Sequence, residues 1–189
     1  SYEIDTLRLL TASFGMYGGS NDNNSDGLTT MWNANRDVLA YQYGSLSDGN
    51  GSWYSMRGNV DYQRTSKKNK DRMITLSYKI STQPQNSDYY TKYRDIKDPF
   101  ELEIIEKFLL NNSHSDGKTN TTEHTFQVDY TTPIGKLHTI EVGGKYIIRN
   151  NLSDNKLFEA KGATDDYEYN NDRSSKYKHM NDILAAYLG

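Results

Sequence analysis

The chain of 189 residues contains no cysteine, which excludes disulfide bonds, thiolate zinc sites and cysteine nucleophiles. No apolar run approaches the ~20 residues of a membrane-spanning helix. Hydrophobic residues make up only 34% of the chain, and the mean hydropathy is -0.90. Basic charge is not in excess either, since 22 Lys and Arg stand against 25 Asp and Glu. A nucleic-acid partner is therefore not expected, because such proteins usually carry a basic face.

Aromatic residues, by contrast, are abundant. The chain has 16 Tyr, 5 Phe and 2 Trp, whereas disordered chains contain few such residues. Tyr and Trp favour β-strands, and they favour interfaces where one end of the side chain is apolar and the other wet. The composition therefore indicates a folded, strand-rich protein despite its low hydropathy.

Apolar and polar residues alternate most regularly in residues 72–81. One face of this segment carries four apolar side chains, Ile74, Leu76, Tyr78 and Ile80. A period of two is typical of a strand with one apolar and one wet face. Residues 54–63 alternate in the same way, and the short polar connector at 66–71 predicts a hairpin.

A second hairpin is predicted farther along the chain. Residues 125–131 and 139–149 alternate with the same period, and Pro133 and Gly135 between them are turn formers. Less regular alternation predicts three more strands, at residues 6–17, 30–43 and 178–189. The three prolines, at positions 84, 99 and 133, lie outside all the predicted strands, as strand geometry favours.

One short helix is predicted in a long connection. Asp98 suits the N-cap, Pro99 the first helical position and Glu101 a capping box. An apolar stripe follows, formed by Phe100, Ile104, Ile105, Phe108 and Leu109. Such a helix packs its stripe on neighbouring loops or presents it to a ligand or partner outside the cell.

The predicted connections alternate in length. Short ones follow the strands that end near residues 63 and 131, and long ones occupy residues 82–121 and 151–177, with a medium one at 44–52. Short turns at one end and long loops at the other are typical of membrane barrels. The sequence therefore predicts an all-β, antiparallel up-and-down meander of about seven strands.

A single partial domain is predicted to occupy residues 1–189. The apolar run at residues 185–188 ends in mid-pattern, so we expect a fragment of a larger transmembrane barrel. Seven strands cut from a ring leave two open edges, and open edges pair with other strands. The isolated fragment is therefore expected to self-associate.

Two segments carry a family resemblance. Residues 126–133 follow a DYTHP-like strand end, with Thr132 where histidine is frequent, and residues 140–146 follow a LEAGLKY-like strand. Together with residues 54–63, 76–78 and 182–187, they resemble the outer-membrane β-barrel family related to TonB-dependent receptors. The shared motifs mark strands and turns and carry no chemistry.

The resemblance implies a location in the bacterial outer membrane, with membrane lipid around the parent protein. It also implies uptake or binding of an unknown solute. Relatives are typically paired with an N-terminal plug domain that takes energy from an inner-membrane complex, and both are expected partners on that ground. No plug and no energy-coupling box can be identified in the sequence.

Charged and polar residues of the predicted strands are the candidate binding residues. If the barrel interpretation holds, seven of them point into the lumen: Arg57, Asn59, Asp61, Lys79, Asp129, Glu141 and Lys145. They would line a solute path or contact a plug. Alternatively, they form charge ladders that only stabilise the sheet.

Neither catalysis nor metal binding is expected. Asp22, Asn24 and Asp26 match the first half of an EF-hand loop, but Asn33 occupies the position that needs a bidentate Glu. A polar turn is the simpler interpretation of that segment. The four histidines are scattered, and no nucleophile elbow, zinc-protease motif or P-loop is present. We therefore expect no enzyme and no cofactor.

A soluble β-sandwich, such as a glycan-binding module, is the rival interpretation. Strand alternation alone does not separate it from a membrane barrel, because the same apolar face can bury an internal core. Tyrosines near the ends of predicted strands fit the aromatic belt of a membrane barrel, namely Tyr17, Tyr43, Tyr54, Tyr130 and Tyr146.

Overall fold

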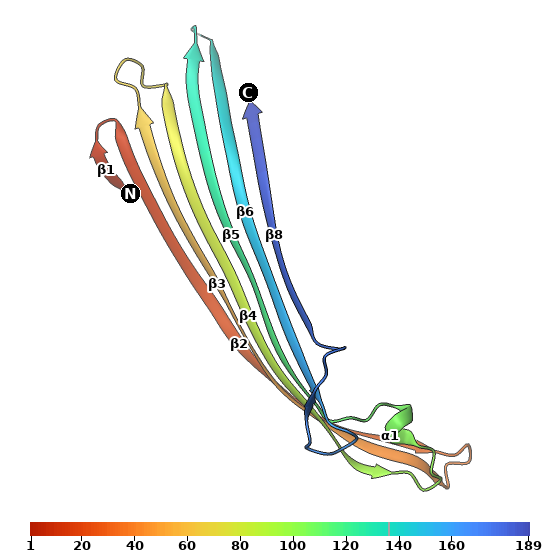
Figure 1. The fold of residues 1–189 in the computed structure, drawn as a ribbon. Helices are drawn as coiled ribbons and strands as arrows, with labels where there is room; N and C mark the ends of the chain where they lie inside the picture. Colours follow the sequence, from red (N-terminus) through yellow and green to blue (C-terminus); the bar gives the residue numbers. More distant parts are fainter. Residues whose placement is uncertain (136) are drawn as a thin grey trace.

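A computed structural model describes residues 1–135 and 137–189, and it forms one antiparallel sheet (Figure 1). The elements in chain order are β1 Tyr2–Asp5, β2 Arg8–Trp32, β3 Leu39–Thr65, β4 Met73–Lys97, α1 Ile104–Lys107, β5 Ser113–Ile134, β6 His138–Glu159, β7 Glu168–Tyr169 and β8 Ser175–Leu188. Neighbours in sequence pair in space, except that β8 passes the short β7 and pairs with β6. The prediction of an all-β antiparallel meander is thus confirmed.

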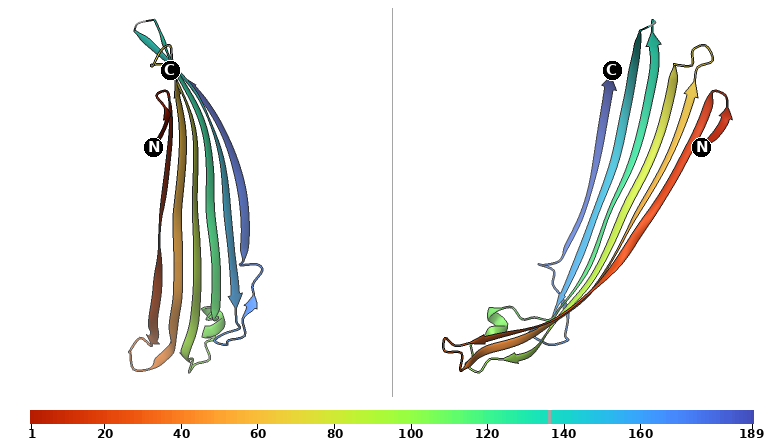
Figure 2. Two further views of the ribbon diagram at one scale, coloured as in Figure 1. Left: turned by 90° about the vertical axis from the view of Figure 1, so that its left-hand side faces the viewer. Right: turned by 180° about the vertical axis from the view of Figure 1, so that it is seen from behind.

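The sheet is open, with β1 on one edge and β8 on the other (Figures 1 and 2). Within the described residues, no pairing joins β8 to β1 or β2. Figure 2 shows the long strands curving together along their length. An open, curved antiparallel sheet of this kind is consistent with part of a larger barrel.

The two ends of the sheet differ in their connections. Short turns at residues 6–7 and 66–72 lie at the same end as both chain termini (Figure 1). The connections at 98–112 and 160–174 lie at the opposite end, which is the lower end in Figure 1. The predicted long loops at 82–121 and 151–177 were therefore too long, because strand pairing extends well into both.

The alternation of faces is regular in the half of the sheet near the short turns. Across one row, Val60 pairs with Ala12 and Tyr78, and Phe126 continues the row through Tyr146 to Leu184. Apolar side chains such as Phe14 (75% exposed) and Leu184 (81% exposed) project into open space. On the other face Thr125 is only 6% exposed. Side chains crowd together on a concave face, so the polar face is the concave one.

The apolar face forms a band of limited height. It runs from the row of Tyr130, Ile74 and Arg64 to the row of Tyr54, ten positions along β3. Ten residues span roughly 33 Å along a strand, and a tilt of about 40° reduces this to roughly 25 Å, the height of the apolar band of outer-membrane barrels. The strands therefore match the thickness of a membrane over this part of their length.

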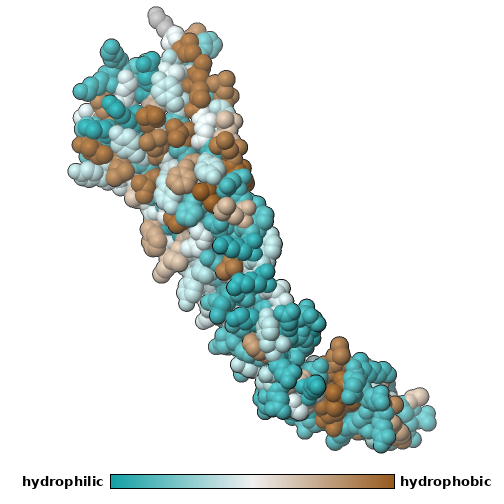
Figure 3. Space-filling view, viewed as in Figure 1, coloured by the Kyte–Doolittle hydropathy of each residue, from teal (hydrophilic) through white to brown (hydrophobic). Residues whose placement is uncertain are grey.

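Beyond the band the strands continue with polar residues on both faces. Figure 3 shows apolar residues gathered in the half near the short turns and around α1, with a largely hydrophilic stretch between. The predicted strand at 30–43 is wrong, because β2 and β3 are joined there by a turn at 33–38. Asn33 closes this turn, since its amide N donates to the Val38 carbonyl at 2.9 Å. The predicted connection at 44–52 is instead part of β3.

Two prolines lie inside strands, contrary to the prediction. Pro84 is in β4, and the pairing of β3 with β4 skips from Trp53–Gln85 to Met56–Thr82 at this point. Proline has no N–H to donate, so the ladder is interrupted there. Pro133 lies near the end of β5, past the last residue that pairs with β4, and it lies opposite Thr139 of β6.

The predicted helix is shorter than expected. Only Ile104–Lys107 is helical, and its N-cap is Glu103, which has a positive φ of 53°. Asp98 still serves as an acceptor for this segment, because its carboxylate accepts from the amide N of Leu102 at 2.8 Å. The apolar stripe is split, with Ile104 buried and Phe100 exposed. No helix in the described part of the chain is long and apolar enough to cross a membrane.

Asn112 ties the two long connections together. It is 3% exposed, its side-chain oxygen accepts from the Tyr93 amide N at 2.7 Å, and its side-chain N donates to the Thr164 carbonyl at 2.8 Å. Its backbone also exchanges bonds with Gly162 and Ala160. Neighbouring Ile104, Leu110 and Ala160 are buried and form a small core at this end of the sheet.

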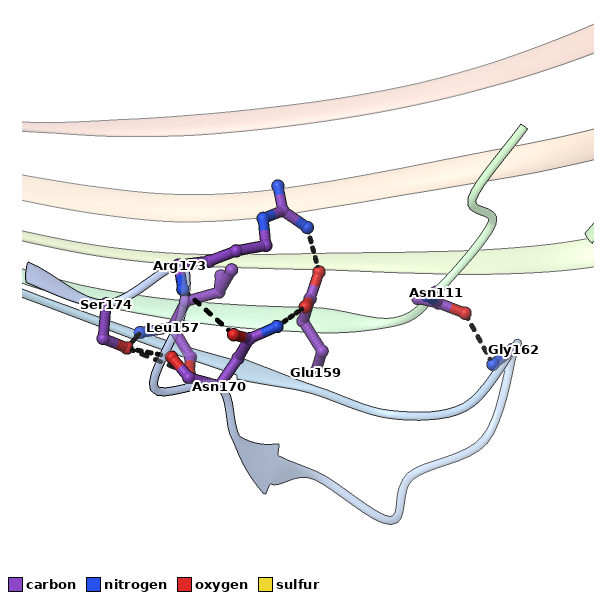
Figure 4. A network of polar contacts seen from close by, with 7 residues as sticks. All are labelled: Asn111, Leu157, Glu159, Gly162, Asn170, Arg173 and Ser174. Atoms are coloured by element: carbon purple, nitrogen blue, oxygen red, sulfur yellow. Dashed lines mark hydrogen bonds and ion pairs between the residues drawn. The ribbon is translucent and has the colours of Figure 1, made fainter. Parts of the chain in front are cut away.

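The connection between β6 and β8 is held by a second set of polar contacts (Figure 4). The Ser174 hydroxyl accepts from the Leu157 amide N at 2.9 Å and donates to the Asn170 carbonyl at 2.6 Å. Glu159 accepts from the side chains of Asn170 and Arg173. The segment is therefore ordered by its own side chains.

We expect Val60→Lys to destabilise the protein in a membrane. Val60 lies on the apolar face near the middle of the band, and a lysine at the bilayer midplane costs about 2–4 kcal/mol. The matched control is Thr11→Lys, since Thr11 lies on the polar face opposite Asp61 and should change stability little. Urea unfolding of the full-length protein in lipid vesicles measures both, and equal losses would contradict the assignment of faces.

We expect Asn112→Ala to loosen both long connections. The change leaves the Tyr93 N–H and the Thr164 carbonyl without their partner, at about 1–3 kcal/mol for each buried group. Amide hydrogen exchange should therefore accelerate in residues 98–112 and 160–174. Asn171→Ala, at an exposed position, is the control. Unchanged exchange in Asn112→Ala would show that other contacts hold the connections.

Candidate functional site

All seven predicted site residues lie on the polar, concave face of the sheet. They come from four strands and occupy odd-numbered positions, which share one face in each strand: Arg57, Asn59 and Asp61 in β3, Lys79 in β4, Asp129 in β5, and Glu141 and Lys145 in β6. Asn59 pairs with Lys79, and Lys145 pairs with Gln127. Antiparallel pairing thus brings residues that are far apart in sequence into neighbouring rows.

Four of the seven line one groove of about 590 Å³. Arg57, Asn59, Lys79 and Lys145 contribute to it, together with Glu123 and Thr125, which are not among the predicted site residues. Asp61, Asp129 and Glu141 lie outside this groove, nearer the short turns. The site residues therefore divide into a groove with three cationic side chains and a more acidic strip beside it.

Three acidic groups on this face already have partners, namely Glu123, Asp129 and Asp61. Glu123 accepts from Arg149 at 2.7 Å, and Asp129 accepts from Gln127 at 2.9 Å and from the Tyr187 hydroxyl. Asn59 donates to Asp61.

The cationic groups of the groove have fewer contacts. Arg57 lies 5.9 Å from the centre of the Tyr17 ring, and within the described residues neither Lys79 nor Lys145 forms an ion pair. The groove therefore offers cationic groups to whatever faces it.

Glu123 and Arg149 are two further charged residues of this face, and of the two only Glu123 lies outside the predicted strands. Both continue the odd-numbered series of their strands, and they pair directly across β5 and β6. Glu123 lies between the predicted connection at 82–121 and the predicted strand at 125–131, although it continues the polar series of Thr125, Gln127 and Asp129. Extending that pattern by one more row would have found it.

A second hollow of about 270 Å³ lies on the same face, beyond the apolar band. We call it the amide hollow. Its side chains come from five neighbouring strands: Asn21 in β2, Trp53 in β3, Gln85, Ser87 and Tyr89 in β4, Thr119 in β5 and Asn155 in β6. None of these is a carboxylate, an amine, a guanidinium or an imidazole.

Glycines shape the floor and walls of the amide hollow. A Cβ at Gly51 would lie 2.7 Å from Asn21 Oδ1, and one at Gly117 would lie 2.5 Å from Ser87 Oγ. A Cβ at Gly19 would lie 3.3 Å from the Trp53 ring, so this indole rests against a bare backbone. The hollow exists because, in several rows of paired residues here, one strand contributes a glycine and therefore no side chain.

Aromatic residues gather on the concave face near the long connections. Phe108 follows α1 and lies 5.3 Å from Tyr41 and 6.2 Å from Tyr43, measured between ring centres. Tyr43 in turn contacts Tyr93 at 6.1 Å. The segment that carries α1 therefore packs on the concave face of β3 and β4 rather than on the convex one.

The convex face at this end carries ion pairs. Arg94 donates to Asp26 at 2.6 Å, and Lys92 donates to Asp165 at 2.8 Å. Asp26 raises the pKa of Arg94, and Asp165 raises the pKa of Lys92, because each carboxylate stabilises the charged form. Asp26 lies within β2, so the polar turn expected around residues 22–27 is wrong.

The tyrosines expected at the membrane surface divide between the faces. Tyr54 and Tyr130 lie at the two borders of the apolar band, as an aromatic belt requires, whereas Tyr146 lies within it. Tyr17 and Tyr43 occupy odd-numbered positions and therefore lie on the concave face. Only part of the expected belt is present.

Comparison with known proteins agrees with this geometry. Residues 64–189 match the model of a family described as an outer membrane protein beta-barrel family. The match covers 126 of the 189 residues, which include β4, β5, β6 and β8. No curated protein matches the chain. The family and the apolar band together place the protein in the bacterial outer membrane, and the chain belongs to the outer membrane protein beta-barrel family.

Proposed function

We propose that this chain forms part of the wall of a TonB-dependent receptor-like protein that binds or takes up a solute, without enzymatic chemistry. In this proposal the concave face lines the lumen, and the groove around Arg57, Lys79 and Lys145 lies on the solute path. The proposal rests on the open sheet of eight strands whose concave face is polar through the whole height of the apolar band.

The number of strands supports a wide lumen. A closed barrel of eight strands has an interior that its own side chains fill, and larger barrels enclose a channel or a plug. Here seven strands lie side by side, because β7 takes the same place beside β6 as β8 does, and their curve is open, so the complete ring contains further strands. A larger ring leaves room for a solute beside the charged side chains.

Energy coupling is the part of the proposal that rests on resemblance. Relatives related to TonB-dependent receptors have a plug domain, and the cationic groove could hold acidic groups of such a plug between transport events. In that case the side chains of Lys79 and Lys145 contact acidic groups of the plug between transport events and contact water during transport. Their accessibility from water would then depend on the energy state of the cell.

Introduced cysteines provide the test, because this chain has none of its own. We expect Lys79→Cys, in the full-length protein in intact cells, to react with a membrane-impermeant maleimide. Val60→Cys, on the apolar face of the neighbouring strand, should not react, because lipid covers it. The parent protein without the substitution gives the background.

Energy dependence is measured in the same cells. We expect labelling at Lys79→Cys to change when a protonophore removes the proton gradient. Labelling of Val60→Cys as fast as Lys79→Cys would overturn the lumen assignment. Labelling of Lys79→Cys that is independent of the protonophore would overturn the energy-coupled part of the proposal.

A further inference from the structure

We infer that the amide hollow binds a neutral saccharide. The inference deepens the proposed function, on which it rests, by naming the class of solute. The hollow lies on the same concave face as the groove around Lys79 but beyond the apolar band, between that groove and the aromatic residues near α1. A solute that enters from the end with the long connections would reach it first.

The amide hollow has no charged side chain, and this lack of charge disfavours ionic solutes. Its inward side chains are amides, hydroxyls and two aromatic rings, whereas the groove below it carries Arg57, Lys79 and Lys145. Anionic or cationic ligands gain most from charge-assisted hydrogen bonds, which this hollow does not offer. A ligand with many hydroxyl groups and no net charge fits it better.

The polar groups of the hollow are available to a ligand. Across the described residues, the side chains of Asn21, Gln85, Ser87 and Thr119 make no hydrogen bond within the protein. The polar residues nearer the short turns are instead paired among themselves, as Gln127 is with Asp129. Amides and hydroxyls both donate and accept. They therefore match sugar hydroxyls, which need both kinds of partner.

Two aromatic rings provide an apolar surface beside these groups. Trp53 is 41% exposed and Tyr89 is 39% exposed. Trp53 lies against Gly19, and a Cβ at Gly49 would overlap the Tyr89 ring, so each ring is supported by a glycine of the preceding strand. The electron-rich face of an aromatic ring attracts polarised C–H groups. The flat C–H face of a sugar ring provides such groups.

The size of the hollow suits a single sugar ring. Its volume of about 270 Å³ equals that of about nine water molecules at roughly 30 Å³ each. Longer chains would extend along the concave face toward Arg57 or toward α1.

Binding of neutral trisaccharides to the full-length protein in detergent tests the inference. The probes are maltotriose, cellotriose, xylotriose and mannotriose, with trigalacturonate as the charged comparison, and calorimetry measures their affinity. We expect at least one neutral trisaccharide to bind more tightly than trigalacturonate. Tighter binding of trigalacturonate, or no binding of any neutral probe, would overturn the inference.

Matched variants locate the site. Trp53→Ala should weaken binding by roughly tenfold or more, as the loss of one aromatic stacking contact does. Trp32→Ala is the control, because Trp32 lies on the other face, at the end of β2, and should leave binding unchanged. If Trp53→Ala does not fold, Gln85→Leu and Trp53→Phe are measured instead, with a loss expected mainly for Gln85→Leu. Wild-type affinity of Trp53→Ala, or of Gln85→Leu where Trp53→Ala does not fold, would overturn the assignment.

The result is independent of the labelling experiment. If Lys79→Cys reacts and Val60→Cys does not, but no saccharide binds, the saccharide inference is rejected and the proposed receptor function is retained. Saccharide binding that depends on Trp53, combined with labelling of Val60→Cys, would reject the lumen assignment and retain the binding site.

Discussion

The continuous antiparallel register is the constraint on which the rest of the structure depends. From Arg8 opposite Arg64 to Met31 opposite Tyr41, β2 and β3 pair without a slip. A shift of one residue would exchange the two faces of a strand, so it would turn Val60 toward water and Asp61 toward lipid. The same register places Asn59 beside Lys79 and Glu123 beside Arg149. Membrane contact, the charged groove and the amide hollow therefore share one cause.

The fold within the membrane could be predicted from the sequence, because lipid on one side and polar surroundings on the other impose a strict period of two. Residues 54–63 and 72–81 show this period, and they were paired correctly in a hairpin. Beyond the apolar band both faces meet water, so neither face requires apolar residues. Residues 20–26 are strongly polar and yet form β2. Strand pairing there is decided by the neighbouring strands, and local sequence does not report it.

The candidate site was predictable to the same extent and for the same reason. Arg57, Asn59, Lys79 and Lys145 were selected by alternation and lie in one groove. The amide hollow was missed, because its residues lie in segments that were assigned to connections. Its glycines were a possible signal: Gly19, Gly49, Gly51 and Gly117 are poor strand formers, and they suggested turns where the strands in fact make room for aromatic rings and amides. Composition alone could not separate these two uses of glycine.

The length of the strands has a consequence for the end of the sheet that carries α1. Residues 39–53 of β3 extend past the apolar band, which corresponds to roughly 50 Å along the strand. Because its strands are paired over that length, this part of the chain is a rigid extension of the sheet and not a set of flexible loops. It places α1 and the Asn112 contacts well beyond the apolar band, away from the part of the sheet that faces lipid. Substitutions at that end of the sheet would therefore act on residues far from the proposed solute path, so this end could change while the part of the sheet that faces lipid stays the same.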